Sequence, residues 1–224
     1  MTTSVTDLAA PTEVYAAALR GARCTVTVDG REATLPVRRW TAPAGAGDRF
    51  LLGHCVGSTI DLGCGPGRLT AELARGGARA LGVDVSDEAV HAARARGAPA
   101  VQADLFGPLP GEGRWGTALL ADGNIGIGGD PALLLARVRW LVAPGGRVVV
   151  ECGAPGTGVR VASVTLRAGG LVSADFPWAE VGCDALGALA AGAGLVPAGV
   201  SRWRRRWVAT LTRPVEDGGA RWPR

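Results

Sequence analysis

The sequence contains no lysine, so all 24 of its basic residues are arginine, and it has only two histidines and one methionine in 224 residues. Against 20 acidic residues this gives a formal charge of +4, which is too small for this length to indicate nucleic-acid binding by charge alone. A GC-rich genome accounts for the preference for arginine and for the 35 glycines. A lone arginine or glycine therefore carries little weight as a functional signal.

Closely spaced cysteines are also absent. No CxxC pair occurs, and two histidines are too few to complete a zinc cluster with the cysteines, which are Cys24, Cys55, Cys64, Cys152 and Cys183. The pattern therefore indicates neither a metal site nor a disulfide framework, and we expect a reducing, cytoplasmic environment.

Long apolar runs are missing as well. No stretch offers the roughly 18 uninterrupted apolar residues of a membrane-spanning helix. The first residues, MTTSVTDLAAPTE, include acidic side chains and no apolar core of a signal peptide. We therefore expect no signal peptide and no contact with a membrane.

What the sequence does contain is a regular alternation of short β-branched runs with helical segments, which is typical of a parallel sheet with crossover helices. We expect strands at 58–63, 80–85, 98–105, 117–122 and 146–153, and helices at 68–77, 86–97 and 131–143. Ser86 is the expected cap of the second helix, and Asp130 with Pro131 opens the third. The segment 106–116 is too rich in proline and glycine to form a helix.

Further elements flank this core. Before it we expect a helix at 12–21 and a hairpin at 24–37 with a type I′ turn at Asp29 and Gly30. After it come an inserted hairpin at 159–178, a helix at 184–194, and antiparallel strands at 195–203 and 205–213, the first placed at a sheet edge by Pro197. The chain is then one domain of 47% apolar composition, with an N-terminal cap (1–45), a core (46–212) and a tail (213–224).

The most informative segment is DLGCGPG, residues 61–67, between the first expected strand of the core and its helix. Glycines at 63, 65 and 67 allow a sharp turn and a close approach to a ligand, while amides at the helix start can face an electronegative group. A dinucleotide loop of the GxGxxG form requires its last glycine at position 68, which is Arg68 here. The GxGxG spacing instead resembles motif I of class I S-adenosylmethionine (SAM)-dependent methyltransferases.

The resemblance covers roughly residues 46–212 and implies an α/β fold, with a doubly wound, mostly parallel seven-stranded sheet whose last strand is reversed. It implies SAM as cofactor. Asp84 ends the second strand, where a carboxylate meets both ribose hydroxyls, and Asp104 ends the third, where the family acid meets the adenine amino group. The implied cofactor-binding residues are Asp61, Gly63, Cys64, Gly65, Gly67, Asp84, Val85, Asp104, Leu105 and Ala121.

The loop ADGNIGIGGD, residues 121–130, follows the fourth strand, where the family places groups facing the transferred methyl. Asp122 and Asn124 could orient or deprotonate a nucleophile, or could simply form turns in a glycine-rich loop. His54 could reach the rim as a general base, although a structural role is more common for a lone histidine. The loop does not resemble the NPPY segment of enzymes that methylate base amino groups.

Other basic and aromatic residues leave alternatives open. Arg202, Arg204, Arg205 and Arg206, interleaved with Trp203 and Trp207, could grip RNA, but alternating arginines at a hairpin turn more often face water. In the N-terminal cap, Arg38 could pair with the methionine carboxylate or could be an exposed strand residue, and Tyr15 and Trp40 lie in the same segment.

The function we expect is in-line methyl transfer from SAM to a small-molecule acceptor, with oxygen as the expected acceptor atom. The alternatives are an RNA methyltransferase and a SAM-binding protein without transfer activity. The flanking hairpins and the loop 121–130 are expected to enclose the acceptor pocket, with apolar walls from Phe176 and Trp178.

Overall fold

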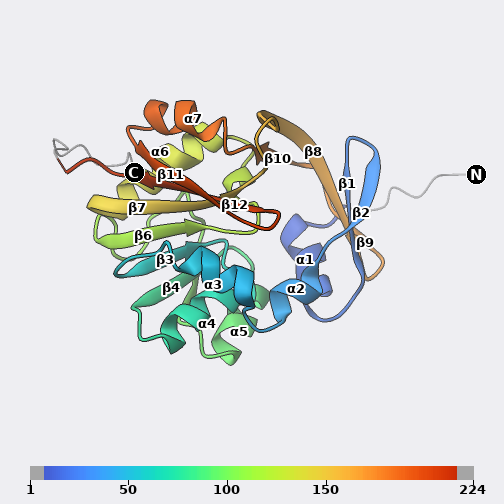
Figure 1. The fold of residues 1–224 in the computed structure, drawn as a ribbon. Coiled ribbons are helices and arrows are strands. Elements are labelled where there is room, and N and C mark those ends of the chain that lie inside the picture. The colour runs from blue at the N-terminus through green and yellow to red at the C-terminus, as the bar shows by residue number, and fades with distance from the viewer. Residues whose placement is uncertain (1–7, 216–224) are drawn as a thin grey trace, which may run out of the picture.

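The computed structural model describes residues 8–215 (Figure 1). Its helices are α1 (Pro11–Leu19), α2 (Val37–Thr41), α3 (Ala46–Leu52), α4 (Arg68–Arg75), α5 (Asp87–Ala95), α6 (Pro131–Leu141) and α7 (Leu186–Gly192), with a short 3₁₀ turn η1 (Asn124–Gly126). Its strands are β1 (Cys24–Val28), β2 (Arg31–Thr34), β3 (Thr59–Leu62), β4 (Ala80–Asp84), β5 (Ala100–Gln102), β6 (Trp115–Leu120), β7 (Val142–Cys152), β8 (Val159–Ala168), β9 (Leu171–Val172), β10 (Phe176–Val181), β11 (Val196–Trp203) and β12 (Arg206–Thr212).

The core is a seven-stranded sheet in the order β11-β12-β7-β6-β3-β4-β5. The neighbouring strands from β7 to β5 pair in parallel, and β12 is antiparallel to both β7 and β11. The predicted fold class, a mostly parallel sheet with a reversed last strand, is therefore confirmed. Strand β11 lies at the edge of the sheet, as expected. Pro197 has no N–H to donate, and an edge strand has a neighbour on one side only, so the sheet tolerates a proline there.

Alternating residues of the central strands supply a core on each face of the sheet. Ile60 and Leu120 belong to the larger core, which includes residues of α6 and α7, while Leu119 and Val149 pack with Leu51 in the core beneath α3 and α4. Helix α5 packs beside α4 and against β4 and β5. The sheet is thus covered on both faces, and the loops that follow β3, β4 and β6 are left free to form a site.

The N-terminal hairpin and the inserted hairpin join to form one second sheet. Strand β8 pairs with β1 on one side and with β10 on the other, all antiparallel, giving the order β10-β8-β1-β2 with β9 beside β8. Helix α1 packs on this sheet through Val14 and Ala18. Asp29 and Gly30 both have positive φ, 48° and 74°, as the type I′ turn requires. In Figure 1 this sheet stands beside the core, on the same side as α1 and α2.

Several local expectations were wrong or incomplete. The hairpin strand expected to continue to residue 37 ends at Thr34, and Val37 begins helix α2 after Pro36. Helix α3 was not predicted, because its seven residues, AGDRFLL, begin with Ala and Gly and lack a side-chain cap in their own N-cap residue Gly45. The third core strand covers only residues 100–102 of the expected 98–105.

The tail expected at 213–224 falls largely on residues 216–224, which lie outside the described part of the chain. Within residues 8–215, no helix is long and apolar enough to cross a membrane.

Candidate functional site

The loop between β3 and α4 has the geometry that its glycines predict. Gly63, Gly65 and Gly67 have φ angles of 71°, 54° and 75°, which only glycine adopts without strain. Each glycine also has a separate reason to lack a side chain. A Cβ at Gly67 would lie 2.6 Å from the Cβ of Ala93 on α5, and one at Gly63 would lie 2.7 Å from Asn124 Nδ2.

Asp84 at the end of β4 faces this loop. One oxygen of its carboxylate accepts a hydrogen bond from the Gly65 amide at 2.8 Å, and the other accepts one from the Ser86 amide at 2.9 Å. Burial raises the pKa of Asp84, although the amide hydrogen bonds oppose the shift. The carboxylate is therefore oriented by the backbone, with further lone pairs for a ligand.

Asp61 lies deeper, below the same loop. It is 2% exposed, and its carboxylate accepts a hydrogen bond from Thr70 Oγ1 at 2.6 Å. Burial raises the pKa of Asp61 to about 6, with the Thr70 hydrogen bond acting in the opposite direction. Burial thus brings the pKa of Asp61 closer to neutral pH, directly beneath the glycine loop.

A cavity of about 740 Å³ extends from the loop to the second sheet. Its volume is within the range of small-molecule and cofactor sites. Of the ten predicted cofactor-binding residues, nine line it: Asp61, Gly63, Cys64, Gly65, Asp84, Val85, Asp104, Leu105 and Ala121. Gly67 does not line the cavity. It faces Ala93 of α5, and its lack of a side chain allows the start of α4 to pack closely on that helix.

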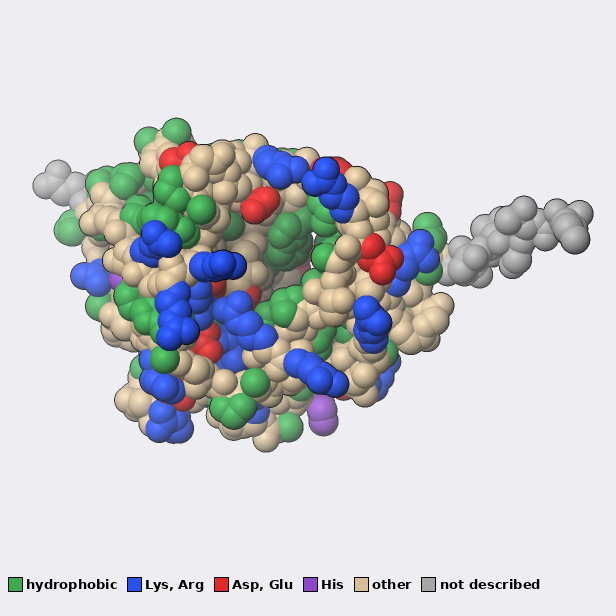
Figure 2. Space-filling model, turned by 45° about the vertical axis from the view of Figure 1, so that its right-hand side comes forward, with side chains coloured by type: hydrophobic (Ala, Val, Ile, Leu, Met, Phe, Trp, Pro, Cys, Tyr) green, Lys and Arg blue, Asp and Glu red, His purple; other side chains and the backbone are tan. Residues whose placement is uncertain are grey.

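The far wall of the cavity is apolar and comes from the second sheet and the segments next to it. Phe176 and Trp178 line it as the sequence predicts, with their rings edge to face at 6.4 Å between centroids. Val26, Val164 and Leu166 complete this wall. Figure 2 shows the molecule hollowed here, with hydrophobic side chains inside the hollow.

The charged residues lining the cavity are four carboxylates, Asp61, Asp84, Asp104 and Asp122, and one guanidinium, that of Arg68. This balance suits a ligand that carries positive charge. It opposes a dinucleotide, whose pyrophosphate would place further negative charge among the carboxylates.

Asp122 and Asn124 occupy the loop after β6 and face the cavity. Asp122 has a positive φ of 51°, and Gly123 follows with 87°. The side-chain amide of Asn124 donates to the carbonyls of Leu62 and Gly63, both at 2.8 Å. Asn124 therefore holds the glycine loop in place.

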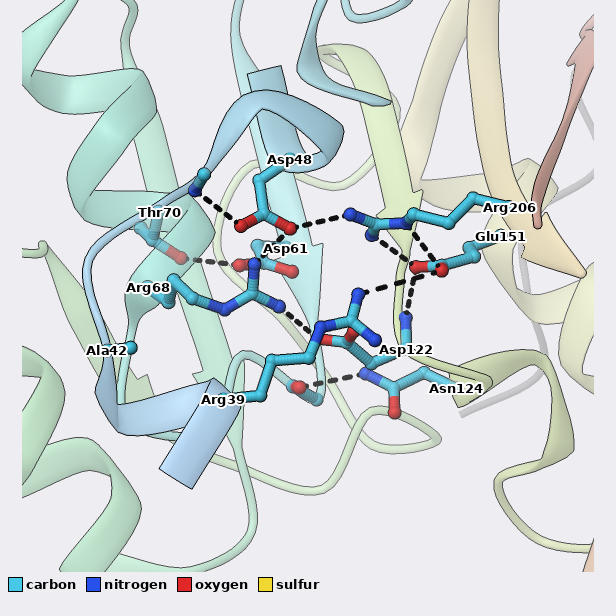
Figure 3. A network of polar contacts seen from close by, with 12 residues as sticks. Arg39, Ala42, Asp48, Asp61, Arg68, Thr70, Asp122, Asn124, Glu151 and Arg206 are labelled. Carbon is cyan, nitrogen blue, oxygen red and sulfur yellow. Dashed lines mark hydrogen bonds and ion pairs between the residues drawn. The ribbon is translucent and has the colours of Figure 1, made fainter. Parts of the chain in front are cut away.

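Asp122 belongs to a network of alternating charges that the sequence does not indicate (Figure 3). Arg68 pairs with Asp122 and with Asp48, and Arg206 pairs with Asp48 at 2.7 Å. The Nε and Nη2 groups of Arg206 also donate to the two carboxylate oxygens of Glu151, at 2.8 and 2.7 Å. Residues from α3, α4, β7, β12 and the loop after β6 are thereby joined beside the cavity.

Arg39 on α2 closes this network from the second-sheet side. Its Nη2 lies 3.0 Å from Asp122 Oδ1 and 3.9 Å from Glu151 Oε1. Burial raises the pKa of Asp122, while Arg68 and Arg39 act to lower it. Both carboxylate oxygens of Asp122 therefore face a guanidinium.

His54 and Arg38 do not line the cavity. His54 follows α3, and its Nδ1 lies 3.0 Å from the Phe50 carbonyl oxygen, with the two rings edge to face. Arg38 is exposed on helix α2, and the expectation that it lies on a strand was wrong. The arginine of this segment that reaches the site is the next one, Arg39. Its position could be found only once residues 37–41 were known to be helical.

Tyr15 and Trp40, from the same N-terminal region, do line the cavity. Their rings meet edge to face at 6.1 Å between centroids. A Cβ at Gly65 would lie 2.9 Å from the Tyr15 hydroxyl oxygen, so Tyr15 covers the glycine loop directly. Burial raises the pKa of Tyr15, and the neighbouring Asp84 adds to the shift, so its hydroxyl keeps its proton.

The arginine and tryptophan cluster lies at the turn between β11 and β12. Arg202 covers the Trp207 ring at 5.1 Å, and Arg204 covers the Trp203 ring at 4.9 Å. Arg206 of this cluster is in the charge network. The tryptophan rings thus already stack with arginines of the same hairpin.

Comparisons with known proteins agree with this geometry. Residues 60–146 match the model of a family described as a methyltransferase domain. A search of curated proteins finds no significant match.

Three solved structures illustrate the likeness in fold. A SAM-dependent methyltransferase from Bacteroides fragilis, in complex with S-adenosyl-L-homocysteine (SAH), aligns over 95% of this chain and 100% of its own, with 19% identity and a TM-score of 0.76. The 1,6-didemethyltoxoflavin-N1-methyltransferase of Burkholderia thailandensis aligns over 79% of this chain and 81% of its own, with 23% identity and a TM-score of 0.57. The sugar N-methyltransferase KedS8 of Streptoalloteichus aligns over 75% and 85%, with 19% identity and a TM-score of 0.56.

The chain therefore has the fold of these solved methyltransferases, and residues 60–146 match the model of a methyltransferase domain.

Proposed function

We propose that this protein binds SAM in the 740 Å³ cavity and transfers its methyl group to a small-molecule acceptor held against the second sheet. The observation that carries the proposal is the placement of Asp84. Its oriented carboxylate and the glycine loop line one cavity, in which four carboxylates stand against one guanidinium. The solved structures with SAH or SAM bound support the same cofactor.

The residues present fit this cofactor at each end. Asp84 offers acceptors to the ribose hydroxyls, and Val85, which is 56% exposed, offers an apolar surface for the adenine ring. Asp104 also lines the cavity, and its carboxylate is our candidate acceptor for the adenine amino group. Arg68, only 4% exposed, has a buried Nε without a hydrogen-bond acceptor and is the guanidinium on the cavity wall for the methionine carboxylate.

When bound, SAM supplies a methyl group that its sulfonium already activates for displacement. The chain must then align an acceptor atom behind the methyl and keep water away. The apolar wall from Phe176 and Trp178 serves the second task, and the loop from Ala121 to Asn124 serves the first.

Oxygen as the acceptor atom stays a prediction, and nitrogen is a second candidate that one observation favours. A hydroxyl acceptor must lose a proton, and both oxygens of Asp122 already face guanidinium groups. His54 does not line the cavity, so it offers no alternative base there. A neutral amine presents a lone pair without prior deprotonation, and several of the structures similar in fold are N-methyltransferases.

The RNA alternative receives less support. Arg202 and Arg204 at the β11–β12 turn already stack on the two tryptophans, and the cavity wall is apolar. We accordingly propose no nucleic-acid partner, and we propose the cytoplasm as the location because none of the five cysteines is in a disulfide.

The proposal is tested by calorimetric titration with SAM, SAH and NAD, followed by detection of SAH formed with a panel of small hydroxyl and amine acceptors. We expect SAM and SAH to bind with micromolar affinity and NAD not to compete. Preferential binding of NAD would overturn the cofactor. Binding of SAM without turnover on any acceptor class would favour the protein that has lost transfer activity.

A further inference from the structure

A second cavity, of about 380 Å³, lies beside the first. The two share Val28, Val164 and Trp178 as lining residues. Gly123 lines the second cavity, and its chain neighbours Asp122 and Asn124 line the first. The second cavity therefore adjoins the first at the loop that we assign to acceptor alignment.

The inner walls of the second cavity are apolar. Ile125 and Val181 are buried there, and Val164 and Trp178 come from the second sheet. The carboxylate on this wall is Glu151, whose charge is matched by the two-point contact with Arg206. A ligand group in this cavity would therefore find an apolar surface with no unpaired charge on its inner wall.

The outer residues of the cavity are charged and exposed. Asp29, Arg160 and Glu180 line it, with side chains 61%, 66% and 62% exposed. Arg160 lies 3.7 Å from Asp29 and 4.0 Å from Glu180, so two carboxylates share one guanidinium. The surplus of negative charge disfavours an anionic ligand.

Trp178 is fixed between the two cavities by its neighbours. It pairs across the strands with Ala162 and forms a bridge with Ile127 of the loop after β6. A Cβ at Gly126 would lie 2.5 Å from the indole Nε1, which shows how closely the loop and the ring approach.

We propose that the second cavity is an acceptor subsite, which takes an uncharged, apolar extension of the methyl acceptor, and that Trp178 determines which extensions can pass from one cavity to the other. This inference rests on the proposed function, because it takes the first cavity to be occupied by the cofactor and the reacting part of the acceptor. The acceptor class is then an elongated molecule with an apolar far end, such as an aryl or alkyl group. Carboxylates and phosphates at that end are excluded.

The test uses a matched pair of fluorescent probes on the full-length protein saturated with SAH. N-phenyl-1-naphthylamine is neutral, and 1-anilinonaphthalene-8-sulfonate has the same rings with one added negative charge. We expect the neutral probe to bind in the presence of SAH. Displacement of the neutral probe by SAH, or no binding to the SAH complex, would overturn the subsite.

Ala162→Phe fills the second cavity beside Trp178 and should weaken binding of the neutral probe about tenfold or more. Ser163→Phe is the control, because the neighbouring residue lies on the opposite face of β8 and lines neither cavity. Retained SAH binding shows that each variant is folded. Equal probe affinity in the two variants, with SAH bound, contradicts the subsite while leaving the proposed function intact. Failure of the parent to bind SAH contradicts the proposed function itself.

Energy transfer gives a second readout that does not depend on a cavity-filling variant. Trp178→Phe should remove the largest share of tryptophan-to-probe transfer, whereas Trp140→Phe, on α6 and outside both cavities, should remove little. Asp29→Asn combined with Glu180→Gln should strengthen binding of the sulfonate probe and leave the neutral probe unchanged. No change for the sulfonate would show that these carboxylates do not govern charge selection.

Discussion

Replacing Asp84 by Asn tests the cofactor assignment most directly, because the change keeps the shape of the side chain and removes its charge. A carboxylate has about four lone-pair sites, and the amides of Gly65 and Ser86 occupy two of them. The other two are available to the ribose hydroxyls. Loss of these charge-assisted hydrogen bonds, with partial replacement by the neutral amide, should weaken SAH binding by about 2 kcal/mol, roughly 30-fold.

The pH dependence sharpens this test. Burial raises the pKa of Asp84, so lowering the pH protonates it and removes the charge that the ribose prefers. The parent should therefore lose SAH affinity as the pH falls, and its advantage over Asp84→Asn should shrink. The charge of Asp84 contributes to the raised pKa of Asp61, so both proteins are compared in an Asp61→Asn background.

Isothermal titration calorimetry with SAH at several pH values provides the measurement, and Asp87→Asn provides the control. Asp87 is an exposed carboxylate three residues away that does not line the cavity. We expect the control to bind SAH like the parent. An Asp84→Asn protein that binds SAH as tightly as the parent at neutral pH would refute the reasoning, as would an affinity ratio that does not change with pH.

Three further predictions concern stability and can be measured by chemical denaturation. Gly67→Ala should cost about 1–3 kcal/mol more than Gly77→Ala, because both have positive φ but only the new Cβ at 67 meets another helix; equal costs would show that the close approach can relax. Arg206→Met should cost about 3–5 kcal/mol, since Glu151 loses its two-point contact and Asp48 keeps only Arg68, whereas the exposed Arg205→Met should change stability by less than about 0.5 kcal/mol. The folded-state pKa of Asp61 is raised to about 6, so the free energy of unfolding of the parent should fall as the pH rises from about 4 to 6 and stay at the lower level above pH 6. Asp61→Asn should flatten this slope, and an unchanged slope in the variant would contradict the role of Asp61.

The sequence is informative where the cause of a structure is local. The glycine spacing at 61–67, the Ser86 cap and the Asp130–Pro131 helix start each depend on residues within a few positions of one another. The Ser86 hydroxyl accepts from the Ala89 amide, and the Asp130 carboxylate accepts from the Leu133 amide, as the caps require. These local signals are enough to place Asp84 at the end of β4 and Asp104 shortly after β5.

The sequence is not informative where contacts join distant segments. Asp48 and Arg206 are 158 positions apart, and neither has a neighbour in the sequence that identifies its partner. The pairing of β1 with β8 likewise joins two hairpins that each have a complete strand pattern by themselves. Alternation predicts that a strand has a buried face, but it does not specify which other strand will lie beside it.

The segment between β5 and β6 shows how a long-range contact can hold irregular backbone. The proline and glycine content of residues 106–116 excludes a helix there. In its place, the fully buried Arg137 of α6 donates from Nε to the Leu105 carbonyl at 2.9 Å and from Nη2 to the Gly107 carbonyl at 2.5 Å.

Arg137 also pairs with Glu112, whose carboxylate in turn accepts a hydrogen bond from the Leu109 amide at 2.9 Å. One side chain thereby satisfies backbone groups that a helix would otherwise have paired internally. Leu105 lines the cavity next to Asp104, so the position of the proposed adenine contact depends on a guanidinium from the opposite side of the segment. This side of the cavity is therefore held without a helix, by a buried guanidinium that donates to the backbone carbonyls of Leu105 and Gly107 and pairs with Glu112.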